Sequence, residues 1–243
     1  MIVEGSGFAR HGEAFTQAQD GRRVDAQAHT MNKYRLSFTF GGLLIPESRV
    51  VAEAYLELGD WDAAKERTLT ENRLGKTRRS TSRRYFREIR DRLAAAYDWE
   101  IEVVAGRADA ATAEGDRAVI LFAVFARYYT LVGDFVTQVL RPRFYGGLTA
   151  IDSAMFRTFM HDQEPAHPEI GALSESTSEK LTTVAMRALR EAGIVAAQSR
   201  RGPFEVRRPE GSARLWERYC NEGRREDYGH LLWPDEEIRK CLR

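Results

Sequence analysis

One run of nine apolar residues, Ala118 to Ala126 (AVILFAVFA), constrains the fold more than any other feature of the chain. It stops at Arg127, well short of the ~20 apolar residues that a membrane-spanning helix needs. Within a helix from Asp116 to Tyr129, the run is apolar on nearly every side. A helix of this kind is stable in water only when other elements surround it. The sequence therefore predicts a central helix buried in a larger helical core.

The length, composition and cysteine pattern of the chain indicate what class of protein it is. With 243 residues, 43% of them hydrophobic, the chain can bury the core of one large domain or two small ones. No basic segment followed by an apolar one marks a secretory signal at the N-terminus. Cys220 and Cys241 form no C-x-x-C pattern, which argues against a disulfide scaffold and a zinc site. We predict a cytoplasmic protein that does not enter a membrane.

Proline and glycine mark the first two predicted helices. Pro46 opens a helix that Gly59 ends, the expected asymmetry of helix punctuation. A second helix is predicted from Asp60 to about Leu74, with Gly75 as its stop.

The third predicted helix, which begins in the cluster at residues 80–82, is strongly basic. Its apolar face is formed by Phe86, Ile89, Leu93 and Tyr97. A neighbouring stripe is formed by Arg83, Arg84, Arg87 and Arg90. At ~100° per residue, the guanidinium groups project together while the apolar face docks on the core.

Charge is segregated along the chain although the net charge is only +1. Residues 73–92 hold nine Lys or Arg and two acidic residues, and residues 187–208 hold six Arg and two Glu. The rest of the chain is therefore acidic. Local positive fields on an acidic protein are typical of proteins that attract polyanions without general stickiness.

The tripeptide Gly75-Lys76-Thr77 raises the alternative of a nucleotide-binding loop. Such a loop needs a glycine five residues before Gly75, where this chain has Thr70, and it follows a buried strand. The preceding segment has the pattern of a helix and lacks a β-branched apolar run. We therefore interpret this stretch as a turn between helices.

Signatures of catalysis are missing from the sequence. It contains no G-x-S-x-G elbow, no G-x-G-x-x-G loop and no cysteine in a nucleophile signature. Glu47, Glu53 and Glu57 are predicted to form a solvated helix face and not an acid/base pair. We expect no enzymatic activity, no cofactor and no metal.

The second half of the chain predicts a different module. Residues 141–147 (RPRFYGG) are the best candidate linker, giving a helical domain at 31–145 and a C-terminal domain at 146–243. A helix from Thr177 to Ala192 precedes two short segments around an Arg-Arg-Gly-Pro turn, which suit a β-hairpin. A helix followed by a basic hairpin is typical of the end of a winged-helix module. Residues 1–30 have the composition of a disordered or extended tail.

Three segments together resemble a specific family. They are SFTFGGLLIPESRVVAEAYLELGDWDAAKERTLTENRLGKTRRSTSRRYFREIRDRL, LSESTSEKLTTVAMRALREAGIV and LLWP. They are similar to the BrxA family, the small accessory proteins of BREX bacteriophage-defence systems. The resemblance implies an all-helical fold, likened in part to NusB, an association with nucleic acid, and no catalytic residues. It also implies other BREX components as partners. The overall expectation is a mainly α protein: an N-terminal helical bundle with a basic helix and a C-terminal winged-helix-like module with a short β-hairpin.

The leading functional hypothesis is a non-catalytic accessory protein that binds duplex DNA mainly through phosphate contacts. Guanidinium groups pair with phosphate oxygens in bidentate fashion. The candidate nucleic-acid-binding residues are Lys76, Arg78, Arg79, Arg83, Arg84, Arg87, Arg90, Arg200 and Arg201. Asn and Gln, the usual readers of adenine, are nearly missing from these elements, which argues against sequence specificity.

Three alternatives stay open at this stage. The basic helix could bind RNA in the manner of NusB, with Tyr85 and Phe86 stacking on unpaired bases. The chain could instead be a protein-interaction scaffold of the defence complex. Arg87 and Arg90 could also pair with acidic residues of the same chain, which would leave the helix with a structural role only.

Overall fold

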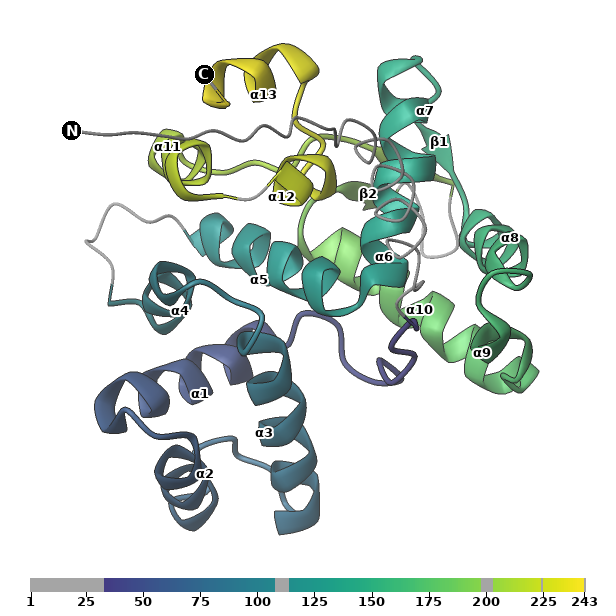
Figure 1. Cartoon of the computed structure of the whole chain (residues 1–243). Helices are drawn as coiled ribbons and strands as arrows, with labels where there is room; N and C mark the ends of the chain where they lie inside the picture. Colours follow the sequence, from purple (N-terminus) through teal and green to yellow (C-terminus); the bar gives the residue numbers. More distant parts are fainter. Residues whose placement is uncertain (1–32, 108–113, 198–202, 224, 243) are drawn as a thin grey trace, which may run out of the picture. The chain divides into compact units, whose positions relative to one another are not determined.

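The computed structural model describes residues 33–107, 114–197, 203–223 and 225–242, all within one compact unit, Lys33–Arg243. Residues 1–32, with the predicted tail, lie outside the described residues. The described part is mainly helical, with one small antiparallel sheet (Figure 1). This confirms the predicted fold class. The division into domains at residue 145 stays a prediction.

Helix α5, Glu114–Tyr128, is the buried central helix that the apolar run predicts. Residues 119–126 are all buried, and the helix packs against α1, α3, α4, α6, α10 and α12 (Figure 1). Among the described residues, no single helix is long and apolar enough to cross a membrane. Helix α5 and the following helical stretch to Tyr145 pass that test only as a pair, which is bent by 107°.

The first three helices pack on one another: α1 (Ile45–Leu58), α2 (Trp61–Thr70) and α3 (Arg79–Leu93) (Figure 1). Gly59 ends α1 at φ 66°, and the side chain of Asp60 caps α2, as predicted. However, α2 ends four residues earlier than predicted. The chain turns through left-handed conformations at Asn72 (φ 47°) and Gly75 (φ 62°), which a continuing helix does not allow.

The third helix is also shorter than its apolar stripe suggests. It ends at Leu93, and Tyr97 belongs to the next element as the N-cap residue of α4, Asp98–Ala105. The backbone N–H of Tyr97 donates to the Glu100 side chain at 2.9 Å, which fixes the start of α4. The placement of Tyr97 on the third helix is therefore wrong.

Five residues of the predicted linker at 141–147 are helical. Helix α6 (Thr130–Phe135) continues through a π-helical turn, η1 (Val136–Leu140), into α7 (Arg141–Tyr145). Pro142 has no N–H and its ring crowds the preceding turn, and the wider π-helical turn just before it relieves that conflict. The helix ends at Tyr145, and the chain then turns through a left-handed conformation at Gly147, where φ is 76°.

The predicted β-hairpin is confirmed. Strands β2 (Val195–Ala197) and β3 (Phe204–Val206) pair antiparallel with Val195 opposite Val206, and β1 (Ala150–Ile151) joins the other edge of β3. The sheet order is therefore β1-β3-β2. Between β1 and β2 the chain forms α8 (Ser153–Gln163), α9 (Pro168–Gly171) and α10 (Glu175–Glu191).

The chain ends in three short helices: α11 (Ala213–Glu222), α12 (Arg225–His230) and α13 (Asp235–Cys241). A disulfide joins Cys220 of α11 to Cys241 of α13. The sequence-based argument against a disulfide is therefore wrong. It relied on local cysteine spacing, whereas the pairing depends on how α11 packs against α13.

We expect this disulfide to hold α13 in place, because no residue of α13 is fully buried. The bridge spans 21 residues, and closing a loop of that size stabilises a fold by about 3 kcal/mol. Urea unfolding of the oxidised protein should lose this amount in the Cys220→Ser, Cys241→Ser double variant. Equal stability of the two proteins, with thiol titration showing the parent to be oxidised, would contradict the prediction.

Candidate nucleic-acid interface

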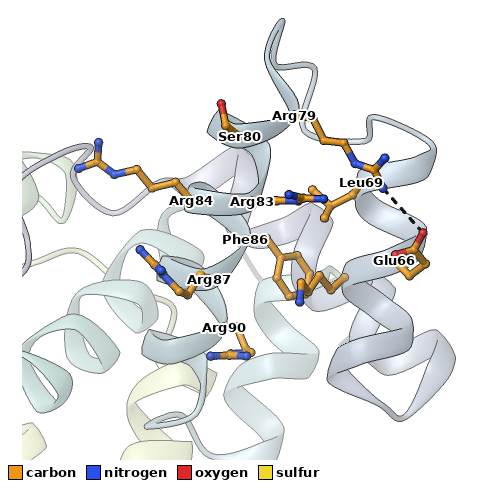
Figure 2. Close-up of a pocket in the computed structure, with 10 residues that line it drawn as sticks. Glu66, Leu69, Arg79, Ser80, Arg83, Arg84, Phe86, Arg87 and Arg90 are labelled. Atoms are coloured by element: carbon orange, nitrogen blue, oxygen red, sulfur yellow. Dashed lines mark ion pairs between the residues drawn. The ribbon is translucent and has the colours of Figure 1, made fainter.

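Five arginines of α3 line an open groove between α2 and α3. They are Arg79, Arg83, Arg84, Arg87 and Arg90. The groove measures ≈ 560 Å³, and Lys65 of α2 adds a sixth cation that the sequence analysis did not select. Figure 2 shows these arginines projecting from α3. The spacing of the basic stripe thus predicted which side chains share a surface.

The opposite face of α3 fixes the helix in the core. Phe86, Ile89 and Leu93 are each 1% exposed, as their helical spacing predicts. Because Phe86 is buried, its side chain is not available to stack on a base. Tyr85 is half-buried beside the ring of Phe40, with ring centroids 5.2 Å apart. The face of α3 that meets solvent is therefore cationic and not aromatic.

Arg78, Arg83 and Arg87 are exposed, and within the described residues their side chains form no ion pair or hydrogen bond. Arg79 lies 3.8 Å from Glu66, the one acidic residue among the described residues that line the groove, and 57% of its side chain stays exposed (Figure 2). The sequence left open that Arg87 pairs with an acidic residue of the same chain. Within the described part of the chain it does not.

Arg84 and Arg90 are partly engaged. The Arg84 guanidinium lies 4.1 Å from the centre of the Phe40 ring, and it donates to Thr39 Oγ1 at 3.4 Å. Figure 2 shows this side chain pointing away from α2. Arg90 pairs with its neighbour Asp91 at 2.6 Å. For Arg90 the alternative of intramolecular pairing is therefore realised, and we expect its charge to be largely neutralised.

Lys76 is held by the protein. Its ammonium lies 2.8 Å from the Glu47 carboxylate and 4.3 Å from the centre of the Tyr85 ring. The hydrogen bond to Glu47 raises the pKa of Lys76 above its usual value. Gly75 lies in the turn between α2 and α3, so the interpretation of residues 75–77 as an inter-helix turn is confirmed.

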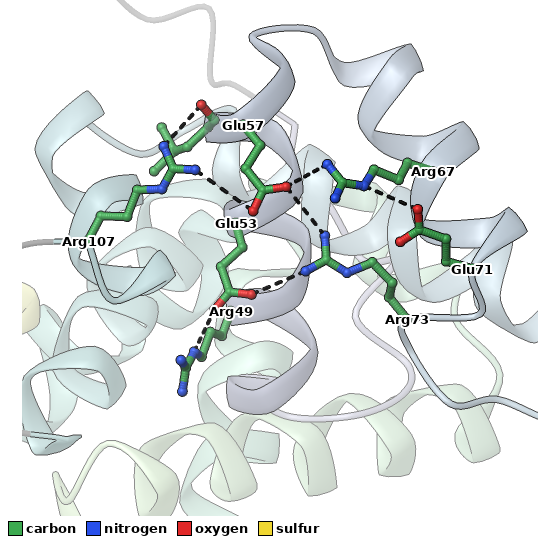
Figure 3. A network of polar contacts seen from close by, with 8 residues as sticks. Arg49, Glu53, Glu57, Arg67, Glu71, Arg73 and Arg107 are labelled. Carbon is green, nitrogen blue, oxygen red and sulfur yellow. Dashed lines mark hydrogen bonds and ion pairs between the residues drawn. The ribbon is translucent and has the colours of Figure 1, made fainter.

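The sequence analysis predicted that the glutamates of α1 form a solvated helix face. In the structure they form ion pairs instead. Glu53 pairs with Arg49 and Arg73, at 2.8 and 3.4 Å, and Glu57 pairs with Arg67 at 2.6 Å (Figure 3). Arg73 also lies 3.9 Å from Glu57, which links the two carboxylates. The network joins α1 to α2 and to the turn that follows α2.

Arg92, at the end of the basic segment, is a core residue. It is 4% exposed, pairs with Glu88 at 2.8 Å and donates to the backbone oxygen of Gly42 at 2.6 Å. The i,i+4 spacing of Glu88 and Arg92 is a sequence signal that could have identified this pair. The basic segment therefore divides into internal cations, namely Arg73, Lys76 and Arg92, and the exposed arginines of α3.

A second group of polar and basic side chains lies on α10. Ser176, Lys180, Thr183, Arg187 and Arg190 recur every three or four residues, and all are exposed. Arg187 is paired with Glu191 at 2.8 Å. The sequence analysis assigned only the buried face of this helix, although the same periodicity defines the exposed stripe. Arg200 and Arg201, predicted to contact nucleic acid, lie outside the described residues.

Fold and surface together define a mainly helical protein with a small antiparallel sheet and one arginine-lined helix. A family model, BrxA, matches residues 32–204, which is more than half of the chain. The chain belongs to the BrxA family, and it is thus an accessory protein of a BREX phage-defence system. This confirms the resemblance seen in the sequence.

Two curated relatives are named "BREX protein BrxA". The protein from Escherichia coli O9:H4 (strain HS) is 28% identical over 161 residues, 66% of this chain and 73% of the relative. The protein from Paramagnetospirillum magneticum (strain ATCC 700264 / AMB-1) is 26% identical over 168 residues, 67% of this chain and 79% of the relative. Neither name indicates a catalytic activity.

A crystal structure of an uncharacterized protein from Magnetospirillum magneticum has a similar fold. It aligns with a TM-score of 0.64 at 21% identity, and the alignment covers 83% of this chain and 99% of that chain. At this level of identity the similarity concerns the fold alone, and it supports the mainly helical architecture.

Proposed function

We propose that this chain is a non-catalytic DNA-binding accessory protein of a cytoplasmic BREX complex, and that it binds duplex DNA mainly through phosphate contacts. The proposal rests on three exposed arginines that have no ion-pair or hydrogen-bond partner in the described part of the chain. They are Arg78, the N-cap residue of α3, and Arg83 and Arg87 within α3. Guanidinium groups of this kind suit bidentate pairing with phosphate oxygens.

The position of these arginines within α3 also supports a functional role. The N-terminal end of a helix carries a partial positive charge, which favours acidic side chains there. The first turn of α3 has no acidic residue, and Arg78 and Arg79 lie at its start. This arrangement is unfavourable for the isolated helix. It becomes favourable when a phosphate approaches, because the cations and the free backbone N–H groups then act together.

The C-terminal half supplies a second argument. A strand, three helices of which α9 is a single short turn, and then a hairpin whose second strand lies between the other two is an arrangement similar to that of a winged-helix module. In such a module the helix before the hairpin is the one that approaches DNA. Here that helix is α10, with Lys180, Arg187 and Arg190 exposed. We propose that α10 and the hairpin, including Arg200 and Arg201, form a second contact with the duplex.

The test compares short duplex DNAs of unrelated sequence with duplex RNA of equal length, by fluorescence anisotropy at several salt concentrations. We expect similar affinities for the two DNAs, since phosphate contacts carry no base information. The slope of log affinity against log salt should be roughly −3 to −5, at about 0.9 per phosphate. Preferential binding of RNA would favour the NusB-like alternative. Salt-independent or absent binding to both would favour a protein-interaction scaffold.

A further inference from the structure

Helix α13 is attached to the fold more weakly than the segment before it. No residue of α13 is fully buried, and Ile238 and Cys241 pack only partly against the core. The preceding segment is anchored firmly, since Tyr228, Leu231 and Trp233 are each at most 3% exposed. A helix of seven residues is not stable on its own in water. The position of α13 therefore depends on its contacts with the rest of the chain.

The strongest of these contacts is a disulfide. The Cys220–Cys241 bridge ties α13 to α11, which is itself anchored by Leu215 and Tyr219, at 4% and 0% exposed. Both cysteines are only partly buried, so the bridge lies within reach of a dissolved thiol. Disulfides in a reducing compartment, such as that of the cytoplasmic complex proposed for this chain, are usually transient and serve in catalysis or redox sensing. The bridge therefore has the position of a reversible tether.

The first turn of α13 neutralises two arginines of other elements. Asp235 pairs with Arg141 of α7 at 2.5 Å. Glu237 accepts two hydrogen bonds, of 2.8 and 3.2 Å, from Arg208, which lies two residues beyond β3. The side chains of Asp235 and Glu237 are 71% and 41% exposed, and ion pairs at the surface contribute little to stability. These pairs therefore do not replace the disulfide in holding α13.

Contacts outside α13 hold both guanidinium groups in place. Arg141 donates to the backbone oxygen of Trp233 at 2.9 Å and lies 5.2 Å from the centre of the Tyr145 ring. Arg208 lies 5.3 and 5.4 Å from the centres of the Trp216 and Trp233 rings. Rings at this distance attract a cation. Because both arginines contact Trp233, they form one surface, which keeps its geometry but loses its carboxylates when α13 leaves.

We propose that the Cys220–Cys241 disulfide is a redox-sensitive switch, whose reduction releases α13 and exposes Arg141 and Arg208 to the phosphates of DNA. A dithiol reductant supplies two electrons and two protons, the S–S bond breaks, both sulfurs become thiols, and the reductant becomes a disulfide. The reverse exchange with an oxidised dithiol restores the bridge. The inference rests on the proposed function and adds a means of regulating it.

The first measurement needs no DNA. Hydrogen–deuterium exchange is compared in the oxidised full chain and in the chain reduced with dithiothreitol, with thiol titration to establish the two states. We expect at least about tenfold faster exchange in residues 235–241 after reduction, since an untethered short helix opens readily, and no change in α5 or α10. The Cys220→Ser, Cys241→Ser variant should exchange rapidly under both conditions. Equal exchange of α13 in the oxidised and reduced chains overturns the proposal.

The second measurement is fluorescence anisotropy with a short duplex DNA at several salt concentrations. The reduced chain should bind at least about tenfold more tightly, with a salt slope steeper by roughly 2, at ~0.9 for each of two phosphates. The Arg141→Gln, Arg208→Gln variant should lose this gain. The matched control, Arg49→Gln, Arg67→Gln, removes equal charge from arginines that pair with glutamates elsewhere, and it should keep the gain.

The two measurements separate this proposal from the proposed function. Release of α13 without a gain in DNA affinity overturns the switch, while DNA binding itself stands. Absence of DNA binding in both redox states overturns the switch and the proposed function together. An equal gain in the Arg141→Gln, Arg208→Gln variant also overturns the switch, because the extra affinity then comes from another surface.

Discussion

Replacing Arg127 by Met should destabilise the protein by about 3–5 kcal/mol, the cost of leaving buried charge without its partner. Arg127 is the cation between Glu100 and Asp227, and both carboxylates are 0% exposed. Burial raises the pKa of Glu100 above its ordinary value even with the arginine in place. Without Arg127, the buried carboxyls must either take up protons or stay charged in the core. Urea unfolding followed by circular dichroism measures the loss.

A matched control separates this effect from the removal of any arginine. Arg49 is 54% exposed and pairs with Glu53 at 2.8 Å, so Arg49→Met should change stability by less than about 1 kcal/mol. Adding Glu100→Gln to the Arg127 variant should restore part of the loss, because one buried charge is removed. A loss below about 1 kcal/mol for Arg127→Met would show that the cluster does not need its cation.

The helices that the sequence predicted well are those with complete local signals. The apolar run identified α5, Pro46 and Gly59 marked α1, and the segment before the hairpin identified α10. Each signal depends on residues within a few turns of one another, so a single sequence is enough to recognise it. The π-helical turn before Pro142 has no such signal. A proline followed closely by two glycines is more typical of a linker, whereas residues 141–145 form the helix α7.

The features missed in the sequence depend on contacts between distant segments. Arg127 is joined to Glu100 and Asp227, which lie on α4 and α12, and Cys220 meets Cys241 only because α11 packs against α13. Helical periodicity predicts which face of an element is buried, but not which charged residue of another element will meet it.

The same limit applies to the candidate interface. Spacing along α3 predicted that Arg83, Arg84 and Arg87 would be exposed, and they are. It did not predict that Glu47 of α1 would neutralise Lys76, a residue 29 positions away. Counting charges along the segment therefore overestimates the cations available to a ligand. A binding test should target the arginines that the fold leaves unpaired within its described part.

The variant that meets this requirement changes Arg78, Arg83 and Arg87 together to Gln. If each arginine contacts one phosphate, the slope of log affinity against log salt should flatten by roughly 2 to 3, at ~0.9 per phosphate. Extrapolated to physiological salt, this corresponds to roughly a hundredfold weaker binding of duplex DNA. The loss should be similar for unrelated sequences, because phosphate contacts position a protein without reading bases. The fold should persist, since these side chains lie off the face formed by Phe86 and Ile89.

The control for this experiment removes equal charge from arginines that the protein already neutralises. Arg49, Arg67 and Arg218 each pair with a glutamate within 2.8 Å. Their triple change to Gln lowers the net charge by the same amount but removes no unpaired cation from α3. We expect at most a small loss of affinity and an unchanged salt slope. Equal losses in the two variants would mean that DNA responds only to overall charge, and the assignment of α3 as the contact surface would then be wrong.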